Sequence, residues 1–257
     1  FCSIPIIRGN YVSKPIDSLI EETRKLVDKG VKEIMVIAQD LSFYGVDLNG
    51  KQQLPELLDK LSAVSGLDWI RLHYLYPNDF PREILNLMAE RENICKYIDL
   101  PFQHISDNML KTMKRHFSRE KSYELIAHIR KTVPDIAIRT TLLVGHPGET
   151  DDDFNQLKQF VLDARFDRLG VFQYSHEEGS HSYNSYQDTI EDYIKASRAE
   201  EIMMLQQDIS FEKNQAKIGK TLKTIIDRHE GEFSIGRTQF DSDEVDNEVL
   251  IENLDLN

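Results

Sequence analysis

Apolar residues recur with two different periods along the first two thirds of the chain. Ile16, Leu19, Ile20 and the apolar positions up to Val27 follow helical spacing, which predicts a helix that ends at Gly30. The next segment, EIMVIAQD (33–40), is almost continuously apolar and predicts a strand buried on both faces. The two patterns then keep alternating, with helices predicted over 54–64, 81–90 and 119–132 and strands over 69–76, 97–101, 136–145 and 168–175.

Local capping signals mark further helices. Ser106 precedes the helical segment NMLKTMKR and is a candidate N-cap. Thr150 is followed by three aspartates, which favour the positive end of a helix dipole, and then by an apolar stripe that reaches Ala164. After the strand over 168–175, a loop to about residue 188 leads to a long helix over roughly 190–218.

Five strands joined by helices predict an α/β fold with parallel strands and right-handed crossovers. A closed eight-stranded barrel needs about 250 residues, so five units are too few for closure. We expect a partial (β/α) barrel of about six parallel strands, the sixth lying upstream of Phe1.

The pattern changes at residue 219. Short strand-like segments separated by Glu-Gly and Asp-rich turns predict a small all-β domain over 219–257. This region carries ten acidic and four basic residues, a net charge of 4 − 10 = −6. The predicted division is therefore a barrel over 1–189, a connecting helix packed on it over 190–218 and the β domain over 219–257.

Charge and cysteine content narrow the functional classes. The net charge of −13 argues against nucleic-acid binding as the primary mode and favours a basic partner, although it also serves solubility alone. Two cysteines make no disulfide framework, and no stretch resembles a membrane span or signal peptide. A cytoplasmic protein without a membrane partner is expected.

Polar side chains follow the predicted strands at their carboxyl ends, where parallel α/β folds bind ligands. They include Gln39 and Asp40, then Gln103 and His104, and the turn from Gly145 to Glu149. Arg139 lies inside an otherwise apolar strand. We expect these residues to share one site.

Each of these residues also has a purely structural interpretation. Gln39 and Gln103 would each satisfy a strand end, Arg139 would form a buried ion pair, and the glycines would make a tight turn. A metal hydrolase built on His104, His146, His176 and His181 is weakly supported, because the sequence has no His-x-His or His-Glu-x-x-His spacing. A nicotinamide enzyme lacks its Gly-x-Gly-x-x-Gly motif.

Six stretches, spread over most of the chain, resemble the methylthiotransferases of the radical S-adenosylmethionine (SAM) superfamily. They are FCSIPIIRGNYVSKPI, IAQDLSFYGVDLNGKQQLPELL, RLHYLYP, YIDLPFQHISDNMLKTMKR, RTTLLVGHPGETDDDF and VFQYSHEEGS. The wording is closest to the branch that modifies an aspartate of ribosomal protein S-twelve. The tRNA-modifying branch typically has Gly-Gln-Asn where Ala38-Gln39-Asp40 stands, and Gln-Ser-Gly-Ser where Gln103-His104-Ile105-Ser106 stands.

The resemblance gives Cys2 a role. Family members hold a 4Fe–4S cluster on a Cys-x-x-x-Cys-x-x-Cys loop, and Cys2 fits its third cysteine. By this resemblance the chain is a fragment that lacks the first two ligands and an N-terminal domain carrying a second cluster. The fragment alone would be inactive. Cys95 fits no ligand position and is expected in the core.

The resemblance also implies the reaction. The reduced cluster cleaves SAM to methionine and a 5′-deoxyadenosyl radical, which takes hydrogen from the β-carbon of the target aspartate. The second cluster supplies sulfur and another SAM supplies the methyl group. We expect Gln39 and Asp40 near the methionine amino group, Arg139 at its carboxylate, and Gln103 with the Gly145–Glu149 turn near the ribose or adenine.

The implied partners are ribosomal protein S-twelve or the small ribosomal subunit, together with an electron donor. The β domain resembles a TRAM domain, which favours RNA in tRNA-modifying relatives, but its charge of −6 favours a basic protein. A tRNA methylthiotransferase and a non-catalytic ribosome-binding module are the alternatives.

Overall fold

The computed structural model describes residues 7–252, and Cys2 lies outside them. The five parallel strands form two hydrogen-bonded groups, β1-β2 and β3-β4-β5, which together we call the larger sheet. The Leu75 N–H, just after β2, donates to the Asp99 carbonyl of β3 and links the two groups, and Ile70 of β2 forms a parallel bridge with Ile94, just before β3. The strands are β1 (Glu33–Val36), β2 (Trp69–Leu72), β3 (Tyr97–Asp99), β4 (Ala137–Val144) and β5 (Arg168–Gln173).

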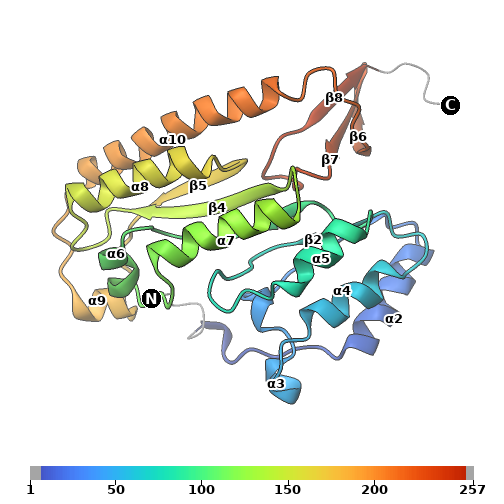
Figure 1. Cartoon of the computed structure of the whole chain (residues 1–257), viewed down its shortest axis with the longest axis horizontal. Helices are drawn as coiled ribbons and strands as arrows, with labels where there is room; N and C mark the ends of the chain where they lie inside the picture. The colour runs from blue at the N-terminus through green and yellow to red at the C-terminus, as the bar shows by residue number, and fades with distance from the viewer. Residues whose placement is uncertain (1–6, 253–257) are drawn as a thin grey trace.

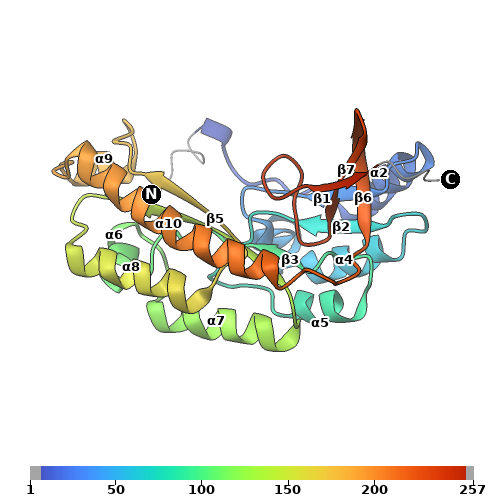
Figure 2. The same ribbon diagram turned by 90° about the horizontal axis from the view of Figure 1, so that it is seen from above.

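Helices follow the strands and cover one face of the sheet, as Figure 2 shows for α5, α7 and α8. Leucine, isoleucine and phenylalanine side chains from both layers make the main core between them. The helices are α2 (Ile16–Asp28), α4 (Leu54–Ser62), α5 (Glu83–Glu90), α6 (Asp107–Thr112), α7 (Arg119–Thr132), α8 (Asp151–Ala164) and α10 (Asp192–Gln215), with the short η1 (Leu41–Phe43), α3 (Val46–Asn49) and α9 (His181–Ser185) between them. None of the helices within residues 7–252 has the length and apolar character needed to cross a membrane.

The C-terminal strands form a separate antiparallel sheet in the order β6-β7-β8. Its members are β6 (Thr224–Glu230), β7 (Phe233–Thr238) and β8 (Val249–Glu252). Helix α10 runs along β5 and α8 and leads to this sheet (Figure 1). The α/β sheet followed by a small all-β unit confirms the predicted fold class.

Two sequence-based expectations need correction. The segment over 33–40 was expected to be a strand buried on both faces, but β1 ends at Val36, with Met35 40% and Ile37 63% exposed. Only the face carrying Ile34 and Val36 packs against the helices. The loop between β5 and α10 contains α9. By contrast, Thr150 caps α8 as predicted: its hydroxyl accepts from the Asp153 N–H, and the Asp153 carboxylate completes a capping box.

Candidate functional site

The inner face of the larger sheet lies opposite the helices. We call the amino end of its parallel strands the lower end and the carboxyl end the upper end. Several strands each carry one charged side chain on this face, toward the lower end. Register places Asp99, Arg139 and Arg168 side by side on β3, β4 and β5, and Arg71 opposite Met35 on β2 and β1. Because partners in parallel strands point to the same side, these charges form one layer. The sequence analysis singled out only Arg139 of this set.

The chain from Arg237 to Asp246, which we call the floor segment, closes the lower end of this inner face. It runs from the end of β7 toward the larger sheet (Figure 2). Phe240 packs there against the apolar cluster of Trp69, Tyr97 and Ala137. The C-terminal sheet is thus connected to the barrel through buried contacts.

Every strand of the larger sheet contacts the floor segment. Arg237 pairs with Glu33 of β1 at 2.7 Å, and Arg71 of β2 donates to the Gln239 carbonyl at 2.9 Å. Arg168 of β5 pairs with Asp241. These side chains are nearly inaccessible to solvent, so their charges require the pairing that they have.

Asp246 is the central carboxylate of the floor segment. The Tyr97 hydroxyl donates to its Oδ2 at 2.7 Å and the Ser242 N–H does so at 2.8 Å. Its Oδ1 lies 3.8 Å from Arg139 Nε and 3.9 Å from Arg168 Nε. Burial raises the pKa of the Tyr97 hydroxyl, and the nearby Asp246 charge raises it further, so the phenol stays a donor.

Arg139 therefore lies between two carboxylates, since NH1 is also 3.4 Å from Asp99 Oδ1. Burial would lower the pKa of Arg139, but Asp99 and Asp246 outweigh that effect and the pKa is raised. The structural alternative considered from sequence, a buried ion pair, is thus present. The Arg139 side chain nevertheless keeps 22% of its surface exposed.

The upper end of the inner face, which we call the rim, consists of the residues that follow the strands. Asp40 begins η1 by accepting from the Ser42 N–H at 2.9 Å, while Gln39 is exposed. Burial raises the pKa of the Asp40 carboxyl, although the hydrogen bonds from Ser42 oppose it. Gln39 and Asp40 therefore lie at the rim, as expected.

Strained backbone marks the rim at two points. Gln103 has φ +66° and Tyr74 has φ +57°, values that cost about 1–3 kcal/mol for residues other than glycine and that cluster at functional sites. Gln103 pairs with Leu142 as an isolated parallel bridge, which places it beside the upper part of β4. Its side chain is partly exposed there.

The turn after β4 is rigid because of Gly145 and Glu149. Gly145 has φ +77°, and its N–H donates to the Glu149 carboxylate, which is buried. Glu149 also lies 3.4 Å from Arg198 and 3.6 Å from His104 Nε2. The Glu149 side chain thus fixes the shape of the turn, in which Gly148 is exposed and Gly145, His146, Pro147 and Glu149 are buried.

Apolar side chains at the rim remain exposed to solvent. Ile37 and Phe172 are each 63% exposed, and Tyr74 is 46% exposed. Alternate residues on β1 and β5 pack in the core, so Ile37 and Phe172 project from the inner face. An exposed apolar surface of this kind, beside fixed polar groups, is typical of a ligand site.

Other candidates from sequence are structural. His146 bonds to Ser182 at 2.8 Å, and burial lowers its pKa to about 4. Within residues 7–252, no group of three His, Cys, Asp or Glu side chains is arranged to hold a metal ion, so the metal-hydrolase alternative gains no support there. Cys95 is buried as predicted, and desolvation raises its pKa to about 12.

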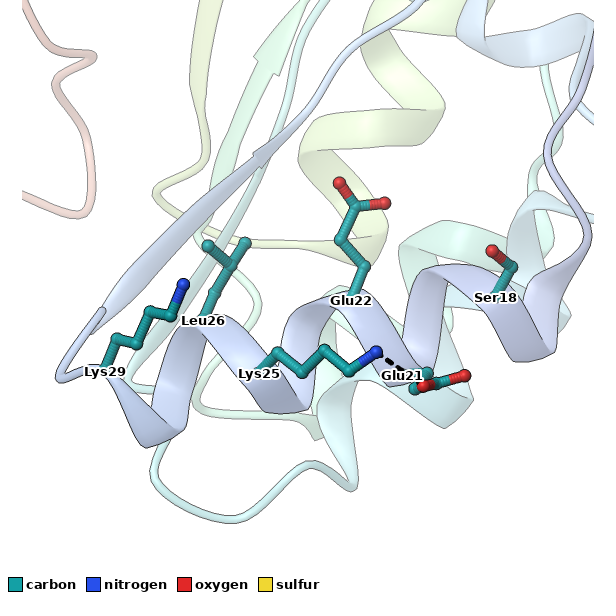
Figure 3. A pocket seen from close by; sticks show the side chains of 6 residues that line it. All are labelled: Ser18, Glu21, Glu22, Lys25, Leu26 and Lys29. Atoms are coloured by element: carbon teal, nitrogen blue, oxygen red, sulfur yellow. Dashed lines mark hydrogen bonds and ion pairs between the residues drawn. The ribbon is translucent and has the colours of Figure 1, made fainter.

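A shallow hollow along α2 has no part in this site. It is lined by Ser18, Glu21, Glu22, Lys25 and Leu26 of that helix and by its C-cap residue Lys29 (Figure 3). Lys25 and Glu21 pair across it at 2.6 Å, as an ordinary exposed i,i+4 pair does.

Family comparisons agree with the two-part fold. Residues 1–161 match the radical SAM superfamily and residues 218–256 match the TRAM domain. The chain is 55% identical over 251 residues to the ribosomal protein uS12 methylthiotransferase RimO of Bacteroides fragilis, covering 98% of this chain and 58% of that protein. It is 53% identical over 252 residues to the protein of the same name from Flavobacterium johnsoniae, covering 98% and 57%. The chain thus spans little more than half the length of these relatives.

Solved structures share the fold at low sequence identity. The coproporphyrinogen III oxidase HemN of Escherichia coli, a radical SAM enzyme, superposes with a TM-score of 0.53 at 16% identity, covering 80% of this chain and 48% of that one. The radical SAM methyltransferase TsrM of Kitasatospora setae gives 0.51 at 17%, covering 62% and 31%. The superfamily match extends over more than half of the sequence, through β1–β4 and most of α8. The chain belongs to the radical SAM superfamily.

Proposed function

We propose that the chain is part of a methylthiotransferase that modifies the β-carbon of an aspartate in ribosomal protein uS12. The main support is its identity of 51–55% to proteins of that name over 98% of its length. Because it spans 58% of such a relative, this activity belongs to the longer protein.

The C-terminal sheet supports a protein substrate rather than tRNA. Arg237 is bound by Asp227 at 2.8 Å, and Arg228 by Glu230 and Glu248 at 2.6 Å. Lys223 pairs with Asp68 at 3.0 Å. Nucleic-acid affinity depends on cations available to phosphates, and these three are already paired with carboxylates. A basic ribosomal protein suits this acidic surface better.

The rim has the groups that a SAM molecule requires. Gln39 and Asp40 would hold the methionine amino group, while Gln103 and the backbone of the Gly145–Glu149 turn would contact the ribose or adenine. The exposed apolar surface of Ile37 and Phe172 offers contacts for the rest of the SAM molecule. A SAM molecule bound there would cover these apolar side chains, and exclusion of water would protect a reactive species.

The cluster ligands require thiolates outside the described residues. We assign Cys2 as one ligand of a 4Fe–4S cluster, with two more cysteines upstream and a second cluster in the longer protein. Cys95 is excluded as a ligand because its thiol is buried among Trp69, Tyr97 and Ala137. When bound, the cluster and SAM supply the radical chemistry that removes hydrogen from an unactivated carbon.

The partners follow from this activity. They are uS12, free or in the small ribosomal subunit, and a reductant for the cluster. We place the reaction in the cytoplasm, where ribosomal proteins are made and where thiolates stay reduced.

Turnover by the longer protein tests the proposal. The full-length protein is reconstituted anaerobically with iron and sulfide and incubated with SAM, a reductant and one of three substrates: isolated uS12, small subunits or tRNA. Mass spectrometry should find a methylthio group on one aspartate of uS12. Modification of tRNA alone would assign the tRNA-modifying activity, and binding to small subunits without any modification would assign the non-catalytic module.

Two cysteine variants serve as matched probes of the cluster assignment. Cys2→Ala should lower the iron and sulfide content and abolish turnover. Cys95→Ala should leave iron content unchanged, because its thiol lies in the core. Equal iron loss in both variants would refute the assignment of Cys2.

A further inference from the structure

Arg139 differs from the other arginines of the inner face in how much of its side chain is exposed. The Arg71 side chain is 0% exposed and Arg168 9%, whereas Arg139 is 22% exposed. The floor segment covers the first two through Gln239 and Asp241. Arg139 is thus the cation of this layer that a ligand can reach from above.

The contacts of Arg139 with its neighbours orient the guanidinium and use only part of its bonding capacity. Its recorded partners among residues 7–252 are Asp99, at 3.4 Å from NH1, and Asp246, at 3.8 Å from Nε. A guanidinium has five N–H donors in a fixed plane. The contacts with Asp99 and Asp246 involve Nη1 and Nε, which leaves the Nη2 donors for an anion.

Open space adjoins Arg139 one step higher on the sheet. The next residue pair of β4 and β5 on the same face is Thr141 and Gly170. A Cβ added at Gly170 would meet no atom within 4 Å. A short side chain entering from the rim therefore has room beside Arg139.

Arg139 lies deeper on the inner face than the residues proposed to hold the cofactor, which favours the substrate as its ligand. Gln103 pairs with Leu142, three residues above Arg139 on β4, which corresponds to roughly 10 Å at 3.3 Å per residue. A cofactor held at Gln39, Gln103 and the Gly145 turn lies above this level. A substrate whose carbon must meet the cofactor enters the space beneath it.

We propose that Arg139 binds the side-chain carboxylate of the substrate aspartate, with Asp99 and Asp246 as positioning residues. The inference rests on the proposed function, because it requires an acidic protein side chain as substrate. It replaces the sequence-based expectation that Arg139 binds the methionine carboxylate. It also gives the floor segment of the C-terminal sheet a part in substrate recognition, through Asp246.

Discrimination between aspartate and asparagine provides the test. Binding of uS12, and of uS12 with its target Asp changed to Asn, is measured with the full-length cofactor-loaded protein without reductant, so that no turnover occurs. A charge-assisted hydrogen bond should favour Asp over Asn by about 10- to 100-fold. Arg139→Gln should bring this ratio close to one, and Arg139→Lys should keep part of it.

Three controls separate recognition from folding. Lys223→Gln removes a charge at an exposed ion pair outside this layer, so the Asp/Asn ratio should stay as in the wild type. Arg139→Gln leaves Asp246 without one of its cations. The double variant Arg139→Gln/Asp246→Asn removes the Asp246 charge as well and therefore preserves the net charge. Affinity for SAM, measured by equilibrium dialysis, should change less than about twofold in the Arg139 variants.

Three outcomes would overturn the inference. If the Arg139 variants keep the Asp/Asn ratio and lose SAM affinity, the bound carboxylate is that of the cofactor. If wild-type protein modifies uS12 but binds the Asp and Asn forms equally, the inference fails while the proposed function stands. If uS12 is neither bound nor modified, both fail together.

Discussion

The floor and the rim of the inner face are built from different kinds of contact. At the floor, Arg71, Arg168 and Arg237 are buried, and each has a carboxylate or carbonyl partner within the chain. At the rim, Ile37 and Phe172 are mostly exposed, and the polar groups are fixed by strained backbone. The floor is complete within the described chain, whereas the rim presents groups suited to a ligand.

This difference separates stability from function within one sheet. Removing a floor charge leaves its partner buried and unpaired, which destabilises the fold strongly. Filling open space on the inner face, as at Gly170, should leave the folded state intact and block what would enter. Variants that remove a floor charge and variants that fill this space should therefore fall into two classes, one defined by unfolding free energy and the other by ligand binding.

The largest effect is expected at the floor. Arg168→Ala should lower the free energy of unfolding by about 3–5 kcal/mol, because Asp241 and Asp246 lose a buried partner. Urea denaturation followed by circular dichroism measures this. Lys223→Ala, at an exposed ion pair, is the control and should cost less than about 1 kcal/mol. Equal losses would mean that the floor network contributes no more than surface pairs.

Two glycines test where an added side chain finds open space and where it does not. Gly145→Ala should cost about 3 kcal/mol, because its φ of +77° disfavours a side chain and the new Cβ would overlap Lys195. Gly170→Ala should change unfolding by less than about 1 kcal/mol, since its Cβ would meet open space. It should still weaken binding of uS12. A destabilised Gly170→Ala protein would contradict the open space above Arg139.

Stability should fall in mild acid because of His146. Burial lowers its pKa from 6.5 to about 4, so between these values the unfolded state takes up a proton that the folded state does not. The unfolding free energy should therefore decrease by roughly 2–3 kcal/mol as the pH falls from about 6.5 to 4. Urea denaturation across this range, compared with His146→Gln, isolates the contribution. An unchanged slope in the variant would refute it, and Ser182→Ala, which keeps the imidazole, should retain a slope.

The smallest stability effect is expected at the capping box of α8. Thr150→Ala removes the hydroxyl that accepts from the Asp153 N–H and should cost about 1 kcal/mol. Thermal unfolding measures it. Ser18→Ala, on the outer face of α2, is a neutral control. A loss above about 2 kcal/mol would show that Thr150 does more than cap the helix.

Local patterns predicted much of the fold. The helix over 119–132 was predicted from apolar spacing and is α7 (Arg119–Thr132), and Thr150 was identified from its neighbours alone. Such features depend on residues close in the chain. β1 was mispredicted because a continuous apolar run gives no information about which face meets a second layer.

The floor could not be predicted from local patterns. Glu33, Arg71, Asp99 and Arg168 each stand out as a charge in a short strand. Only the tertiary structure brings Glu33 to Arg237, Arg71 to the Gln239 carbonyl, and Arg168 to Asp241, 73 residues away. The sequence contains one signal of the floor, which is a charged residue in each of several consecutive strands. The rim was more accessible, because strand ends follow from local patterns and parallel strands place their ends together.

Hydrogen–deuterium exchange tests the claim of a sealed floor and an open rim most directly. In the full-length protein, the amides of Phe240, Asp241, Ser242 and Asp246, which are bonded within the floor segment, should exchange slowly both without ligands and with SAM and uS12. Amides of 37–44, 101–105 and 145–149 at the rim should become protected when the ligands are added. Fast exchange of the floor segment in the free protein, or protection by ligands at the floor and not at the rim, would contradict the account.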